Sequence, residues 1–230
     1  MIGVFDSGVG GFNSIPALRK KLPLADIVYL ADRKNAPYGT KSEDEVLVLA
    51  EGCIDRLVSY GAERILMACC TASTVWHKMD ESRRNVAVPI IQYAENGLRG
   101  DERRVLVIAT ERTVADGAFI KAIKKKCPSA DAVQVPKQSL VLAVEKGARD
   151  GNMKDATQEE VEEIRRLAEE YRPDALILGC THFSSVAELI GNAAPMARIV
   201  NPAHLGAYAI SRDVIRLGIN VRECGRLIYM

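Results

Sequence analysis

Two cysteines occupy matching positions in the two halves of this sequence. Cys69 follows the apolar run "RILMA", and Cys180 follows "ALILG". Such runs are typical of strands in a parallel sheet, and ligands bind beyond the carboxyl ends of these strands. A helix is expected to begin just after each cysteine, and the N–H groups at a helix N-terminus lower the pKa of a nearby thiol from about 8.5. Cys69 and Cys180 are therefore candidates for chemistry that requires a thiolate.

The alternative for any cysteine is a small buried hydrophobic residue. We adopt that interpretation for Cys53, Cys127 and Cys224, whereas the residues alone leave both interpretations open for Cys69 and Cys180. The chain contains no C-x-x-C pair, so we expect no zinc site.

Polar residues accompany the cysteines at the predicted strand ends. His182 lies two residues after Cys180, where it could give a proton to the thiol or take one from it. Asp6 ends another predicted strand and begins "DSGVGG", an incomplete dinucleotide fingerprint because Asn13 stands where a third glycine is required. We expect Asp6 and Ser7 to face a ligand, with the glycines allowing close approach of the backbone, although a simple strand-end turn is the alternative for Asp6.

The elements that must position these residues alternate between strands and amphipathic helices. Strands are predicted at 2–5, 26–31, 64–68, 88–91, 104–109, 131–136, 175–179 and 197–200. Helices are predicted at 13–22, 42–61, 113–126, 138–150 and 157–171, with others beginning near 71, 183 and 202. Asn13 or Ser14, Ser42 and Thr157 are the expected caps of the first, second and fifth helices in that list. This alternation predicts parallel sheets covered by helices on both faces.

The length of 230 residues fits two similar α/β domains. The first is expected at 1–95 together with about 205–230, and the second at 96–204. The break is placed within 92–102, where the apolar periodicity is lost. The last helix and the segment "RLIYM" are expected to return to the first domain.

Composition excludes several classes of protein. Hydrophobic residues make up 48% of the chain, enough for a sizeable core, and 31 basic against 30 acidic residues argue against a nucleic acid as partner. No apolar run approaches the roughly 18 residues that a membrane span requires. The N-terminus lacks the basic region of a signal peptide, so we expect reduced cysteines and a cytoplasmic protein.

Four segments occur together in the order "DSGVGG", "PYGTKS", "ACCTAS" and "LGCTHF". In this order they resemble the glutamate racemases of the aspartate/glutamate racemase superfamily, and the resemblance covers most of the chain. It implies two α/β domains with the active site in the cleft between them, no cofactor and no metal. It also implies that one thiolate removes the α-proton of an amino acid while the other thiol returns a proton from the opposite face.

The resemblance assigns roles residue by residue. The catalytic positions are Cys69, Cys180, Asp6, His182 and Glu145. The substrate-binding positions are Ser7, Tyr38, Gly39, Cys70, Thr71 and Thr181.

The chain departs from the family pattern at several positions. Cys70 replaces the asparagine of A-C-N-T-A-S, and "TERTVADGAF" carries Asp116 and Phe119 where the family has T-x-x-T-V-x-S-x-x-Y. The segments "QVPKQ" and "QYAENG" replace A-C-P and G-V-I-E-P-G. The predicted catalytic pair is thus retained while the residues that order the substrate are altered.

The sequence therefore predicts a cofactor-independent amino-acid racemase, with L- and D-glutamate as the leading substrates and D-glutamate supplied to peptidoglycan. One alternative is a racemase or isomerase of the same superfamily acting on another substrate, such as aspartate. A second is a non-catalytic module that binds a nucleotide or another small ligand. A homodimer is the assembly we consider.

Overall fold

The strands form two separate parallel sheets in the computed structural model, which describes residues 1–219 and 225–230. One sheet has five strands in the order β4-β3-β1-β2-β9, and the other has four in the order β6-β5-β7-β8. The first comprises β1 (Ile2–Asp6), β2 (Ile27–Ala31), β3 (Arg64–Met67), β4 (Ala87–Pro89) and β9 (Leu227–Tyr229). The second comprises β5 (Arg104–Ala109), β6 (Asp131–Pro136), β7 (Ala175–Gly179) and β8 (Arg198–Val200). This arrangement confirms the predicted α/β class.

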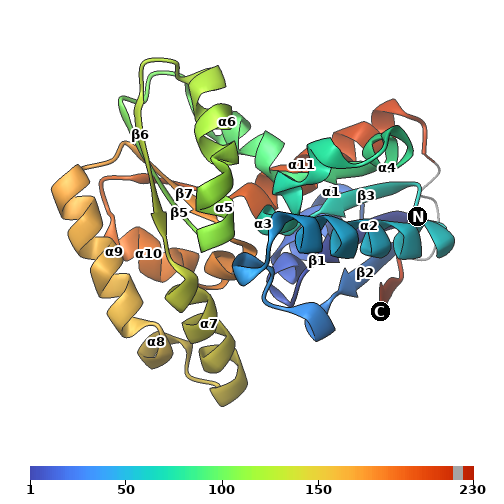
Figure 1. Ribbon diagram of the computed structural model, residues 1–230, viewed down its shortest axis with the longest axis horizontal. Helices are drawn as coiled ribbons and strands as arrows, with labels where there is room; N and C mark the ends of the chain where they lie inside the picture. The colour runs from blue at the N-terminus through green and yellow to red at the C-terminus, as the bar shows by residue number, and fades with distance from the viewer. Residues whose placement is uncertain (220–224) are drawn as a thin grey trace.

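Helices cover both sheets, and each sheet with its helices is called a unit below (Figure 1). The first unit carries α1 (Ile15–Lys21), α2 (Glu43–Ser59), α3 (Cys70–Thr74), α4 (Glu81–Val86) and α11 (Pro202–Arg216). The second carries α5 (Glu111–Asp116), α6 (Ala118–Lys126), α7 (Gln138–Asp150), α8 (Met153–Ala156), α9 (Gln158–Tyr171) and α10 (Ala187–Ala193). Short 3₁₀ helices are η1 (Gly10–Ser14), η2 (Arg33–Asn35), η3 (Tyr38–Thr40), η4 (Trp76–Lys78), η5 (Ile90–Gly97) and η6 (Thr181–Val186).

The alternation of side chains along the strands divides the hydrophobic core. In β1, Val4 packs with α1 and α11 on one face of the sheet, while Phe5 packs with α2 on the other. The α1/α11 side of the core continues through Ile90 of η5 into one face of the second sheet, where it reaches Val107. The remaining face of the second sheet packs against α7, α9 and α10. The two units therefore share one continuous layer of core.

The end of the chain lies against the first unit. Strand β9 pairs in parallel with β2, placing Leu227 opposite Ile27. Helix α11 contacts α1, β3 and η5, so it also packs with the first sheet. The exact domain limits stay a prediction, although η5 occupies the expected break between the units. Cys224 lies outside the described residues.

Some of the predicted helix caps and helix bounds were confirmed, and others were wrong. Ser42 and Glu45 form the reciprocal capping box expected at the start of α2. Ser14 and Thr157 stand at helix starts, but the side chain of neither caps its helix. The single helix predicted at 113–126 is wrong, because Gly117 adopts φ 73° and divides it into α5 and α6.

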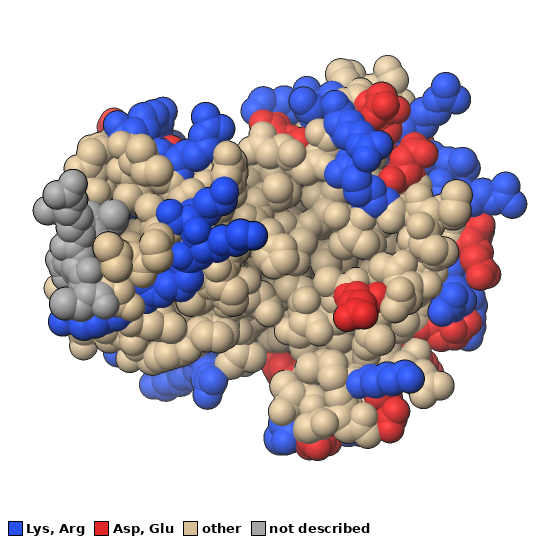
Figure 2. Space-filling view, turned by 180° about the vertical axis from the view of Figure 1, so that it is seen from behind, with Lys and Arg blue, Asp and Glu red and all other residues tan. Residues whose placement is uncertain are grey.

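Charged side chains on the face shown in Figure 2 are scattered among uncharged ones, with basic groups over both halves of the molecule. Among the described residues, no helix is both long enough and apolar enough to cross a membrane.

Candidate active site

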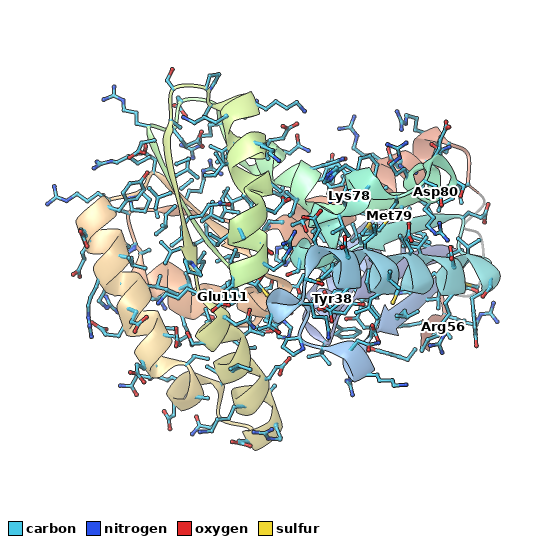
Figure 3. All side chains as sticks on the ribbon, in the orientation of Figure 1. Tyr38, Arg56, Lys78, Met79, Asp80 and Glu111 are labelled. Atoms are coloured by element: carbon cyan, nitrogen blue, oxygen red, sulfur yellow. The ribbon has the colours of Figure 1, made fainter. Side chains whose placement is uncertain are left out.

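A small cavity lies where the carboxyl ends of the strands from both sheets face one another. The ends of β1 and β3 contribute Ser7 and Cys69, and the end of β7 contributes Cys180. Helix α5 contacts η3 at this junction, which is marked by Glu111 and Tyr38 in Figure 3. The cavity is lined by Ser7, Gly8, Ala36, Pro37, Tyr38, Gly39, Cys69, Cys70, Thr71, Thr110, Gln138, Val141, Glu145, Cys180, Thr181 and His182.

The cavity encloses very little space. Its volume is about 20 Å³, which is room for roughly one water molecule. An amino acid would therefore enter only after the two units move apart.

Cys69 caps α3, as the sequence suggested, but its pKa moves in the opposite direction. Its Sγ accepts from the backbone N–H of Ala72 at 3.4 Å and donates to Ser7 Oγ at 3.4 Å. Burial and the negative charge of Asp6 outweigh these contacts and raise the pKa of Cys69 to about 12. The expectation of a lowered pKa is wrong for Cys69, because α3 is only five residues long and the thiol is removed from water.

Asp6 links the two units beneath the cavity. Its carboxylate is fully buried and accepts from the backbone N–H of Gly8 at 3.0 Å and from Thr181 Oγ1 at 3.1 Å. The following glycines do permit close approach, because a Cβ on Gly10 would lie 2.7 Å from the backbone nitrogen of His182. The glycines of "DSGVGG" thus allow the backbone to lie close to η6, while close approach to a ligand stays a prediction.

Cys180, His182 and Glu145 form a chain of polar contacts within the second unit. Cys180 Sγ lies 3.7 Å from His182 Nδ1, and His182 Nε2 lies 3.2 Å from Glu145 Oε1. The latter is an ion pair whose orientation is poor for a hydrogen bond. Burial opposes a charge on His182, but the contacts with Cys180 and Glu145 prevail and raise its pKa well above the usual value. His182 in turn lowers the pKa of Glu145.

The predicted substrate-binding residues line the same cavity. Tyr38 is fixed by its hydroxyl, which donates to Asp32 at 2.7 Å. Thr71 belongs to a triangle of hydroxyls that joins the units, lying 3.0 Å from Thr110 Oγ1 and 3.1 Å from Thr113 Oγ1.

The altered family positions separate into two groups. Cys70 lines the cavity and is almost fully buried, and burial raises the pKa of its thiol well above the usual value. Phe119 is a core residue, and Asp116 lines a different hollow of the surface. The latter two therefore do not contribute to the cavity that holds the thiols.

Sequence reasoning missed two polar residues of the lining, Thr110 and Gln138. Both follow strand ends of the second sheet, β5 and β6, so the strand-end rule could have found them. Among the described residues, no cluster of three or more histidine, cysteine or acidic side chains is placed to bind a metal.

The sequence matches a family model described as Asp/Glu/Hydantoin racemase over residues 14–210. A glutamate racemase from Desulforudis audaxviator is 34% identical over 231 residues, which cover 97% of this chain and 82% of that protein. A glutamate racemase from Koribacter versatilis is 33% identical, covering 95% of this chain and 75% of that protein.

Solved structures show the same similarity in three dimensions. A glutamate racemase from Francisella tularensis in complex with D-glutamate gives a TM-score of 0.87 at 26% identity, covering 99% of this chain and 86% of that one. A glutamate racemase from Thermus thermophilus in complex with beta-chloro-D-alanine gives a TM-score of 0.79 at 28% identity, with the same coverage of both chains.

Proposed function

This chain belongs to the Asp/Glu/Hydantoin racemase family, and from that premise we propose that it interconverts L- and D-glutamate with Cys69 and Cys180 as the two proton-transfer groups. The observation that carries the proposal is that both thiols line one cavity between the units. Two groups of the same type, supplied by different units, suit a reaction whose substrate and product are mirror images at Cα.

The chemistry requires a strong base. One thiolate takes the α-proton, its electron pair stays on Cα, and the thiol on the opposite face returns a proton there. The α-proton of an amino acid is very weakly acidic, so the base must be strong and held in place away from water. Burial supports this role, because the same desolvation that raises the pKa of Cys69 makes its thiolate a stronger base.

The polar neighbours support distinct tasks on each side. We assign His182, paired with Glu145, to hold a proton beside Cys180. Asp6 is positioned to attract the ammonium group of the substrate, because it supplies negative charge beside Cys69. Ser7 orients the Cys69 thiol through their direct contact.

We place the enzyme in the cytoplasm, supplying D-glutamate for peptidoglycan. Two thiols that must stay reduced fit a reducing compartment. The homodimer stays a prediction of the sequence.

The test is a racemisation screen of all L-amino acids, read by chiral chromatography. Glutamate is expected to give the highest kcat/KM. Cys69→Ser and Cys180→Ser should each lower that value by several orders of magnitude, because a hydroxyl is a far weaker acid than a thiol. Cys53→Ala serves as the matched control, since Cys53 is buried outside the cavity lining. Near-normal turnover by either serine variant would contradict the two-thiol mechanism, and a preference for another amino acid would contradict glutamate as the substrate.

A further inference from the structure

Gln138 follows the end of a strand. Its side chain has no role in the contacts of the neighbouring residues or in the proton transfers of the proposed reaction. Gln138 is the first residue of α7 and comes two residues after β6 ends. Its neighbour Lys137 is anchored away from the cavity, with its backbone N–H donating to Ala109 at 2.7 Å and its ammonium group paired with Glu163. This anchoring fixes the start of α7, and Gln138 lines the cavity.

The side-chain amide of Gln138 is buried but has no partner. Both Oε1 and Nε2 are shielded from solvent and make no hydrogen bond with any described residue. The amide lies against the first unit, because a Cβ added to Gly39 would be 2.3 Å from Gln138 Oε1. A buried amide that lacks partners is unfavourable for the folded protein. Such a group at the edge of a ligand cavity is explained if a ligand supplies the missing hydrogen bond.

The charge of the cavity indicates which ligand group that is. No lysine or arginine occurs among the described residues that line it. His182 also lines the cavity, but its ring is already paired with Glu145. Neutral donors are therefore the groups left to hold a substrate carboxylate. Among them the thiol of Cys70 offers only one weak donor, whereas the Gln138 amide offers two N–H groups.

The position of the acidic groups indicates where a carboxylate would lie. Asp6 and Glu145 contact Thr181 and His182 on one side of the site. Gln138 instead lies at the side formed by Gly39 and Thr110, because a Cβ added to Gly39 would touch both Gln138 and Thr110. An ammonium group is attracted to the acidic side, so a carboxylate of the same substrate is favoured at the neutral side.

We propose that Gln138 is a substrate-binding residue whose Nε2 donates to a carboxylate of the amino-acid substrate. The inference rests on the proposed function and extends it, because it adds a residue of the second unit to those the family pattern supplies for binding. It also explains how a chain with Cys70 in place of an asparagine can hold a dicarboxylic amino acid.

The test compares the racemisation kinetics of glutamate for the wild type, Gln138→Met and Gln138→Glu. Gln138→Met keeps the length of the side chain and removes both donors. KM should therefore rise about 10- to 150-fold, which corresponds to the free energy of one hydrogen bond to a charged group. Gln138→Glu should raise KM further, because a carboxylate repels the carboxylate of the substrate. In both variants kcat should fall less than KM rises.

Gln158→Glu is the matched control, because Gln158 is likewise the first residue of a helix, α9, but is exposed and outside the cavity lining. A new charge at that helix start should leave KM unchanged. Thermal unfolding of each variant separates a folding defect from a binding defect.

The inference is overturned if both Gln138 variants keep KM within twofold of the wild type, or if only kcat falls. In either case an active wild type leaves the proposed function standing. A wild type that does not racemise glutamate overturns the proposed function, and the inference falls with it.

Discussion

Individual residues of the site divide into those that strand position predicts and those that only the fold reveals. Cys69 and Cys180 could be selected from the sequence because each ends an apolar run, and the carboxyl ends of parallel strands gather ligand-binding groups. The direction of the pKa shift at Cys69 could not be predicted, because burial comes from segments distant in sequence. Gln138 follows a strand end and could have been selected in the same way, but only the fold shows that its amide lies against Gly39 of the first unit.

The first prediction concerns the charge state of Cys69. With a pKa raised to about 12 by burial and by Asp6, this thiol stays protonated through pH 10 in the ligand-free enzyme. The difference in thiolate absorbance between wild type and Cys69→Ser, followed from pH 6 to 10, should therefore stay near zero.

Asp6→Asn should shift that titration to lower pH. Asp6 raises the pKa of Cys69 because two negative charges repel, so removing one charge makes the thiolate easier to form. Cys69→Ser in the Asp6→Asn background provides the reference for the difference. A wild-type thiolate with a midpoint below pH 8 would show that the helix N-terminus outweighs burial after all.

At the scale of elements, the signals carried by a few adjacent residues were the most reliable. The capping box at Ser42 lies within one turn, and its sequence alone indicated where α2 begins. The 3₁₀ helices η1, η5 and η6 have no comparable signature, because short i to i+3 turns form where the loops between sheet and helix are confined by tertiary packing. The break at Gly117 was missed because an isolated glycine is tolerated inside a helical pattern.

Two glycine substitutions should change stability in opposite directions. Gly117 has φ 73°, a conformation that costs an L-residue roughly 1–2 kcal/mol, so Gly117→Ala should lower the free energy of unfolding by about that amount. Gly52 lies inside α2, where nothing would contact a new Cβ within 4 Å. Gly52→Ala should raise the free energy of unfolding by about 0.5–1 kcal/mol.

Urea denaturation of the two variants against the wild type measures both changes. Neither substitution creates a steric clash, since both glycines have open space around the Cβ position. The backbone conformation is then the only difference between them, and changes of the same sign would contradict the division into α5 and α6.

At the scale of the whole molecule, the two units share a core layer yet must separate to admit a substrate. The layer runs through η5 and α11, on the α1/α11 side of the first sheet. The contacts between the units in and around the cavity include small polar ones, such as Thr71 with Thr110 and Asn13 with Ser185. This contrast favours opening at the cavity while the core layer stays intact. The sequence predicted two domains, but it could not show which contacts between them are apolar core and which are polar.

Closure of the units can be tested at Gly39, whose backbone conformation any residue tolerates. A Cβ there would lie 2.8 Å from Thr110 Cβ as well as 2.3 Å from Gln138 Oε1, so Gly39→Ala must hold the units apart by several tenths of an ångström or more. A displacement of about 1 Å can cost on the order of 100-fold in rate, so kcat/KM for glutamate should fall at least tenfold. The melting temperature should change little, because the core layer that the two units share stays buried. Gly191→Ala, whose Cβ would make only an ordinary contact at 3.7 Å, is the control. Unchanged kcat/KM in Gly39→Ala would mean that catalysis does not require the closed arrangement.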